Sequence, residues 1–150
     1  MTGLVVVLDA GVLDRAGSNK EFRWVLHELV ARGWDPVVPA VVLAEAVTGR
    51  PTDAPVNQVV TRLGTVVTTE PTARLAGHLR FRVGRASGRM IPSGIDAIVA
   101  SHAAQAGHGV VFTTDPSDLQ LLLADHPQVM VDTPQGQPLR LTWRAVPSPL

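Results

Sequence analysis

Short apolar runs alternate with longer stretches of helical character along this chain, and that alternation restricts its fold more than any other feature. The two clearest runs are LVVVL at 4–8 and GVVFT at 109–113. Both are apolar almost throughout, which is typical of strands buried on both faces of a parallel sheet. Helical stretches between such strands predict an α/β fold with a mainly parallel central sheet flanked by helices.

The remaining elements follow from the same pattern, with glycine and proline as boundaries. Further strands are predicted at 36–38, 65–68 and 129–131, and helices at 19–33, 40–49, 54–64, 71–86, 117–125 and after Ser93. Together they predict one domain over residues 1–132, of a size that suits a single core. Residues 133–150 are expected to form a C-terminal extension that can add an antiparallel edge strand at 139–143 before a frayed end.

The composition bears on where the protein works. The chain has no cysteine, which rules out disulfides, thiolate zinc sites and cysteine nucleophiles and fits a reducing cytoplasm. Its N-terminus lacks the basic region of a signal peptide, and no apolar run approaches the length of a membrane span, about 18 residues. We therefore expect a cytoplasmic protein that is not associated with a membrane. Thirteen basic and thirteen acidic residues give zero net charge, so overall charge alone would not hold nucleic acid.

Four acidic residues stand out by their setting. Asp9 and Asp115 come at the ends of the two buried strands, Glu45 interrupts the apolar run VVLAEAV, and Asp96 lies in the apolar first turn of a helix. In open parallel α/β sheets, ligands bind beyond the carboxyl ends of the strands. We therefore expect Asp9 and Asp115 at that edge, with Glu45 joining them if its helix points back over the sheet.

Four carboxylates in a partly desolvated cleft need a counter-charge, and a hard divalent cation is the natural one. Mg²⁺ takes oxygen ligands, keeps several waters and is usually held by one or two carboxylates plus a substrate phosphate. The five histidines are scattered and do not suggest zinc. A carboxylate cluster with Mg²⁺ or Mn²⁺ activates water and stabilises in-line attack at a phosphodiester, so the pattern predicts a nuclease.

Each acid also has a purely structural explanation. Asp9 and Asp115 can be helix N-caps at strand-to-helix turns, and Asp115 lies in TTDPSDL, a good helix start by itself. Asp96 follows Ser93 by three residues, which makes an approximate capping box. Glu45 is the hardest to explain in this way, because an apolar helix face gains nothing from a carboxylate. The occurrence of all four together favours a site.

In these motifs the chain resembles the PIN-domain ribonucleases, and specifically the VapC-type toxins of bacterial toxin–antitoxin pairs. The resemblance covers residues 4–132 and rests on four motifs in order: VVLDAGVL, VVPAVVLAEAV, GIDAIVASHAAQAG and VVFTTDPSDL. It implies a three-layer PIN-like fold, endoribonuclease activity that depends on Mg²⁺ or Mn²⁺, and inhibition by a cognate antitoxin protein. A homodimer is expected as well.

The resemblance also implies roles for the acids. Asp9 and Asp96 would be the principal metal ligands, and Glu45 would be a further ligand or would orient the attacking water. Asp115 would complete the cluster, with Thr113 as a hydroxyl partner beside it.

Two further positions qualify this assignment. Asp118 is a supporting residue that is expected mainly to start a helix. Two residues after the first Asp, many family members carry Ser, Thr or Asn, whereas this chain has Gly11. A hydroxyl or amide that would hydrogen-bond the acids is thus missing, which predicts a weakened or differently tuned site.

An arginine-rich stretch fits an RNA substrate. Five arginines and no acid lie between 71 and 95, and on a helix Arg82 and Arg85 continue a stripe that begins at Arg74. Arg89 follows on the loop that leads to the Asp96 helix. Arg82, Arg85 and Arg89 are therefore the predicted RNA contacts, through phosphates and largely without regard to base sequence. The alternative is a solvated helix face that binds nothing.

Other functions compete with an RNA-cleaving enzyme. A receiver-like signalling domain also places an Asp at a strand end, but it needs a lysine near a late strand, and the one lysine here is Lys20. A DNA-directed nuclease needs extra elements to grip a duplex, and a metal-dependent phosphatase shares the same acid chemistry. The main alternative is a non-catalytic PIN-like module that binds RNA or a protein. Gly11 leaves it open, and the four acids argue against it.

Overall fold

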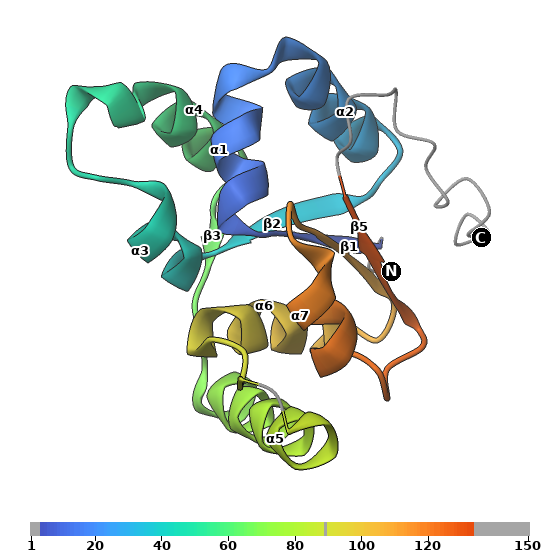
Figure 1. The fold of residues 1–150 in the computed structure, drawn as a ribbon. Coiled ribbons are helices and arrows are strands. Elements are labelled where there is room, and N and C mark those ends of the chain that lie inside the picture. Colours follow the sequence, from blue (N-terminus) through green and yellow to red (C-terminus); the bar gives the residue numbers. More distant parts are fainter. Residues whose placement is uncertain (1–3, 89, 134–150) are drawn as a thin grey trace.

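The computed structural model describes residues 4–88 and 90–133, and Figure 1 shows how they are arranged. The strands in this part are β1 (Val5–Leu8), β2 (Asp35–Pro39), β3 (Thr65–Val66), β4 (Gly109–Phe112) and β5 (Val129–Asp132). The α-helices are α1 (Ala10–Ser18), α2 (Lys20–Ala31), α3 (Leu43–Ala46), α4 (Ala54–Leu63), α5 (Glu70–Ser87), α6 (Gly94–Gln105) and α7 (Pro116–Leu122). Short 3₁₀ turns occupy Ala40–Val42 and Pro51–Asp53.

The strands form one parallel sheet in the order β3-β2-β1-β4-β5. β1 is central and pairs with β2 on one side and β4 on the other, and Leu8 lies opposite Phe112 at the carboxyl ends. The strand order therefore changes direction beside β1. In open α/β sheets the crevice beyond such a switch point is where ligands bind. The predicted α/β fold with a parallel central sheet is confirmed.

Helices cover both faces of this sheet. α1, α2 and α4 lie on one face, and α6 and α7 lie on the other, with α5 packed outside α6 (Figure 1). This is the three-layer arrangement that the family resemblance implies. Within residues 4–88 and 90–133, no helix is both long and apolar enough to cross a membrane.

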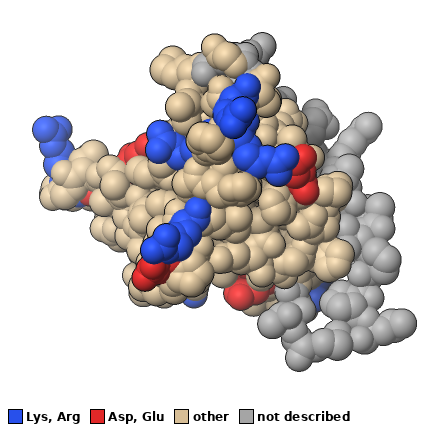
Figure 2. All heavy atoms as spheres, turned by 90° about the horizontal axis from the view of Figure 1, so that it is seen from below, with Lys and Arg blue, Asp and Glu red and all other residues tan. Residues whose placement is uncertain are grey.

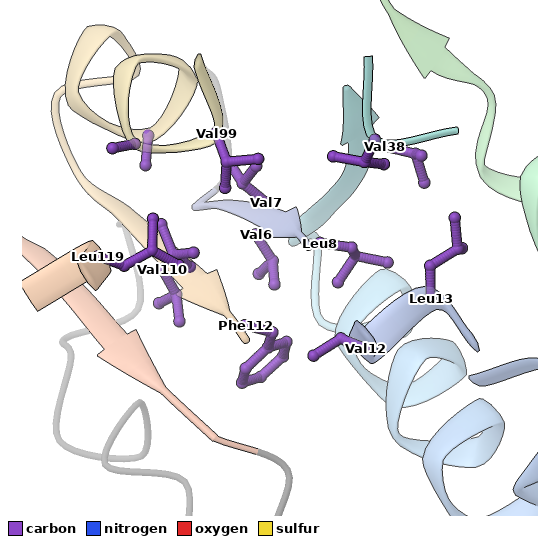
Figure 3. Close-up of a cluster of buried hydrophobic side chains, with 14 of the residues drawn as sticks. Val6, Val7, Leu8, Val12, Leu13, Val38, Val99, Val110, Phe112 and Leu119 are labelled. Carbon is purple, nitrogen blue, oxygen red and sulfur yellow. The ribbon is translucent and has the colours of Figure 1, made fainter. Parts of the chain in front are cut away.

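The core lies on both faces of the two central strands. Successive side chains of a strand point to opposite faces, and Figure 3 shows Val7 beside Val99 of α6 while Leu8 and Phe112 lie toward Val12 of α1. These side chains are fully buried. Phe22 of α2 meets the Phe112 ring edge to face, with 6.2 Å between ring centroids. Burial on both faces explains why β1 and β4 are apolar almost throughout.

One helix is predicted after the first strand, at 19–33, whereas the structure has two. Residues 10–18 form α1, which the sequence hides because Gly11 and Gly17 lower helix propensity. Gly17 has a packing role: a Cβ there would lie 3.1 Å from the backbone nitrogen of Val56 in α4. The glycine therefore lets two helices approach closely, and the buried Leu13 and Ala16 hold α1 to the core.

The helix predicted at 40–49 is mostly wrong. A 3₁₀ turn follows Pro39, the α-helical part is only Leu43–Ala46, and the backbone is extended at Val47. The strand predicted at 65–68 is also shorter, because β3 ends at Val66. The edge strand predicted at 139–143 lies outside the described residues.

Candidate active site

Asp9 and Thr113 meet at the carboxyl edge of the sheet, where β1 and β4 end. Pairing of Leu8 with Phe112 places the next residue of each strand side by side. The backbone N–H of Asp9 donates to the carbonyl oxygen of Phe112 at 3.0 Å, which continues the ladder one step past the strands. Two segments separated by more than a hundred positions in the chain are thus joined at this edge.

The Asp9 carboxylate is held at both oxygens. Oδ1 accepts the Ala10 N–H at 2.7 Å, so Asp9 caps α1, and Oδ2 accepts the Thr113 hydroxyl at 2.8 Å. The residue is only 9% exposed. Each oxygen keeps a lone pair beyond its one hydrogen bond. The cap that the sequence offered as a structural explanation is therefore present, and it leaves the carboxylate able to bind a ligand.

Thr113 connects this carboxylate to the start of α7. Its side chain is fully buried, and its oxygen accepts the Asp115 N–H at 3.1 Å. The hydroxyl also lies 3.1 Å from the Asp115 carbonyl oxygen, but it has one proton, and the shorter bond to a charged oxygen is the stronger one. Thr113 therefore fixes the Asp9 carboxylate relative to the segment that follows β4.

Asp96 lies in the first turn of α6, where Ser93 caps the helix by accepting the Asp96 N–H at 3.0 Å. Burial raises the pKa of the Asp96 carboxyl, hydrogen bonding by Ser93 opposes this, and the charges of Asp9, Glu45 and Asp118 raise the pKa further. These acids come from the end of β1, from α3 and from α7. The structure therefore brings four segments of the chain into electrostatic contact around Asp96.

Glu45 reaches this group from α3, a single turn of helix rather than the longer helix predicted, and its side chain is exposed. The turn after it is held by Asp53. The Asp53 carboxylate accepts the Thr48 N–H at 2.9 Å, the Thr48 hydroxyl at 3.0 Å and the Gly49 N–H at 2.7 Å. Asp53 is not among the acids that stand out in the sequence. The feature of the sequence that could have identified it is the turn at Thr48 and Gly49, whose backbone N–H groups need an acceptor.

Replacing Asp53 with asparagine should release this turn. Burial acts to raise the pKa of Asp53, but the hydrogen bonds from Thr48, Gly49 and Arg50 outweigh it, so the net pKa lies below its usual value. Stability from a lowered carboxyl pKa is present above the unfolded value and is lost as pH falls through the folded value. Asp53→Asn should therefore melt several degrees lower than wild type at about pH 7, and the gap should narrow near about pH 3.

The control is Asp35→Asn, which removes an exposed acid at the start of β2. Melting followed by circular dichroism at both pH values distinguishes the two variants. An Asp53→Asn protein that melts with wild type at neutral pH would show that the turn after Glu45 does not depend on this carboxylate.

Asp115 and Asp118 both lie at the start of α7 but differ in surroundings. Asp115 is exposed, caps the helix and accepts the Ser117 hydroxyl at 2.8 Å. Asp118 is half-buried, and its charge acts on Asp96. The sequence ranked Asp115 above Asp118, whereas the electrostatics connect Asp118 to the other acids. Both remain candidate site residues.

The donor chemistry of this edge suits a hard cation. The acids that interact there are carboxylates, the ligand type that Mg²⁺ and Mn²⁺ prefer. Among residues 4–88 and 90–133, no three His, Asp or Glu side chains are arranged so that they could hold a metal ion. Mg²⁺ in nucleases commonly takes one or two carboxylates, waters and substrate phosphate. The residues fit that open coordination and do not fit a closed protein cage.

The arginines of α5 are largely engaged with other groups. Arg74 pairs with Glu70 at 2.8 Å, Arg82 pairs with Asp125, and Arg80 donates from Nε to the Pro92 carbonyl at 2.9 Å. Figure 2 views the side of the molecule that carries α5 and shows basic side chains spread over it, some with an acid beside them. Arg74, Arg82 and Arg85 lie on one helix, as predicted. Glu70 and Asp125, which lie outside the arginine-rich stretch, pair with Arg74 and Arg82 and offset their charges.

Arg85 differs from these arginines, because its guanidinium lies over the exposed ring of Phe81, 5.7 Å from the centroid. Of the three predicted RNA contacts, Arg82 is thus paired with an acid and Arg85 rests on an aromatic ring. Arg89 lies outside the described residues.

Solved structures of other proteins share this fold. The sequence matches no protein-family model and no curated protein. A chain of the VapBC2 complex from Rickettsia felis, crystallised with a DNA fragment from its promoter, superposes with a TM-score of 0.68 at 16% identity, covering 87% of this chain and 98% of that one. A chain of a toxin–antitoxin complex from Klebsiella pneumoniae gives a TM-score of 0.57 at 17% identity, covering 83% and 95%. The PIN-like fold expected from the resemblance is therefore confirmed.

Proposed function

We propose that this protein is a divalent-metal-dependent endoribonuclease and the toxin of a type II toxin–antitoxin pair. The observation that carries the enzymatic part is the convergence of charges from Asp9, Glu45 and Asp118 on Asp96 at the carboxyl edge of the sheet. Repulsion among partly buried carboxylates disfavours their ionised forms, and natural sites keep such groups where a cation compensates them. The fold shared with two toxin–antitoxin complexes supports the biological part.

A bound Mg²⁺ or Mn²⁺ would supply an activated water and offset the negative charge of the substrate phosphate. Asp9 and Asp96 would hold the ion, since the Asp9 carboxylate is fixed by Ala10 and Thr113 and Asp96 lies in the first turn of α6. Glu45 would orient the attacking water from the exposed rim, because its short helix leaves the side chain in solvent. Asp115 and Asp118 would complete the acidic rim from α7.

The experiment that tests this proposal is cleavage of a mixed cellular RNA pool by the purified protein. Discrete fragments should form with Mg²⁺ or Mn²⁺ and should be absent in EDTA, because the acids need a cation to act on phosphate. Sequencing of the fragment ends would identify the cleaved RNA. A protein that binds the divalent ions but leaves all RNA intact would reject the enzymatic proposal.

A second candidate function is a PIN-like module that binds RNA or a protein without cleaving. The observation that favours it is Gly11, which brings no hydroxyl or amide to the acids. The same cleavage assay separates the two functions, since the binding module would retain RNA or its partner protein in EDTA and would never produce fragments.

The proposed protein partners are a cognate antitoxin and a second copy of this chain. Among the described residues the exposed large apolar side chains are Trp24, Val30, Val67, Phe81, Met90 and Ile91. Met90 and Ile91 are adjacent in the chain, and apolar side chains that form one exposed patch mark protein contacts. We place these partners and the RNA in the cytoplasm, in keeping with a chain that has no cysteine.

Replacing Arg85 with glutamine should weaken the binding of single-stranded RNA. If Arg85 binds one phosphate, its removal should lower the slope of log affinity against log salt by about 0.7. Arg62→Gln is the matched control, because it removes the same charge from an exposed position on α4, across the sheet from α5. Fluorescence anisotropy with a labelled RNA at several salt concentrations measures both. Equal slopes for the two variants would show that Arg85 does not touch the RNA.

A further inference from the structure

The space that a side chain at position 11 would fill is occupied by Thr114. A Cβ built on Gly11 would lie 2.2 Å from the Thr114 hydroxyl oxygen, and 3.2 and 3.3 Å from its Cγ2 and Cβ. The first distance is far below any real contact, so Thr114 and a larger residue 11 cannot both keep these positions. The glycine and the threonine therefore belong together as one local arrangement.

This arrangement lies in the candidate site. Gly11 is in the first turn of α1, two residues after Asp9. Thr114 lies between Thr113, which binds the Asp9 carboxylate, and Asp115, which caps α7. The Thr114 hydroxyl is thus brought over the N-terminal turn of α1, on the same side of the sheet edge as Asp9.

The two neighbouring threonines use their hydroxyls differently. The Thr113 hydroxyl is buried and fully used between Asp9 and Asp115. Thr114 is exposed, and within residues 4–88 and 90–133 its hydroxyl takes part in no hydrogen bond. A hydroxyl held at a site edge without a protein partner is available to a ligand, and it can donate to an anionic oxygen.

We propose that Thr114 is a substrate-binding residue whose hydroxyl donates to a non-bridging phosphate oxygen of the RNA at this site. It supplies, from the end of β4, the hydroxyl that Gly11 does not carry on α1. Thr114 can lie at the site only because residue 11 is glycine. The site therefore has a hydroxyl although residue 11 departs from the family pattern. The inference rests on the proposed function, because it takes the ligand to be RNA.

Three variants test it. Thr114→Val keeps the shape and removes the hydroxyl, Thr114→Ser keeps the hydroxyl, and the double variant Gly11→Ser with Thr114→Ala moves a hydroxyl to α1. A hydrogen bond to a charged group is worth a factor of about 10 to 100. Thr114→Val should lose that factor in kcat/KM for RNA cleavage and in RNA affinity measured with Ca²⁺ in place of Mg²⁺. Thr114→Ser should stay near wild type, and the double variant should recover part of the loss.

The affinity with Ca²⁺, which also takes oxygen ligands and compensates the acids, keeps this test apart from the test of nuclease activity. If wild type binds RNA but never cleaves it, the enzymatic proposal fails while the Thr114 variants still report on the phosphate contact. Unchanged RNA affinity and unchanged cleavage in Thr114→Val would overturn the inference. A Thr114→Ser protein as weak as Thr114→Val would also overturn it, because the shape of the side chain rather than its hydroxyl would then matter.

Discussion

Asp96→Asn should lower RNA cleavage by more than about a hundredfold, since losing even a partner behind a metal ligand costs about 10- to 100-fold. The change removes the anionic charge at the point where the fields of Asp9, Glu45 and Asp118 meet. It keeps the size of the side chain and the Ser93 cap, which involves the backbone N–H. Cleavage rates with saturating Mg²⁺ or Mn²⁺ measure the effect.

The same variant should be more stable than wild type at neutral pH in EDTA. Because burial and neighbouring charges raise the pKa of Asp96, the folded protein favours its protonated form. Stability from that form is present in acid and is lost as pH rises through the raised pKa. Asparagine cannot ionise, so Asp96→Asn should melt above wild type near about pH 7, and the difference should shrink in acid.

Asp14→Asn is the control, since it removes an exposed acid from α1 at a distance from the cluster. It should cleave RNA and melt as wild type does. An Asp96→Asn protein that cleaves at the wild-type rate would remove Asp96 from the site. One that is inactive but less stable would indicate a structural role in place of a site carboxylate.

Thr113→Val should have the second largest effect, because one buried hydroxyl serves two groups. Its loss leaves Asp9 Oδ2 and the Asp115 N–H without their partner. A buried group left unsatisfied costs about 1–3 kcal/mol, so the free energy of unfolding should fall by about that amount. Cleavage should fall about 10- to 100-fold, as expected when a residue that orients a metal ligand is removed.

Thr113→Ser separates the hydroxyl from the methyl group. It keeps both hydrogen bonds and loses one buried methyl, so cleavage should stay near wild type while stability falls by about 1 kcal/mol. Urea unfolding and cleavage assays on both variants provide the measurements. Equal cleavage by Thr113→Val and wild type would show that Asp9 does not need Thr113 to act.

The central strands and the edge where the acids lie could be predicted because both depend on short-range pattern. A run such as LVVVL can only be buried on both faces, and an acid at its end must emerge at the carboxyl edge of a parallel sheet. The N-caps formed by Asp9, Ser93 and Asp115 follow from equally local rules.

The failures of prediction come from contacts that helix and strand patterns do not indicate. α1 contains two glycines that are unfavourable in isolation, and contacts to α4 and to Thr114 explain both. α3 is short because Asp53, several residues later, draws the backbone into a turn. The pairing of Arg82 with Asp125 joins α5 to the segment after α7, and no helical period can foresee it. The contacts of the two glycines and of Arg82 are tertiary and override local preference, whereas the Asp53 turn closes over four to five residues.

The bond between Asp9 and Thr113 joins residues 104 positions apart. A chain that is still being synthesised has β1 and α1 long before β4 leaves the ribosome, and until then the Asp9 carboxylate has no Thr113 to orient it. The site is therefore completed only once β4 has joined β1 in the sheet. A nascent or truncated chain without β4 has the first acid but not the assembled edge, which confines any activity at this edge to the finished domain.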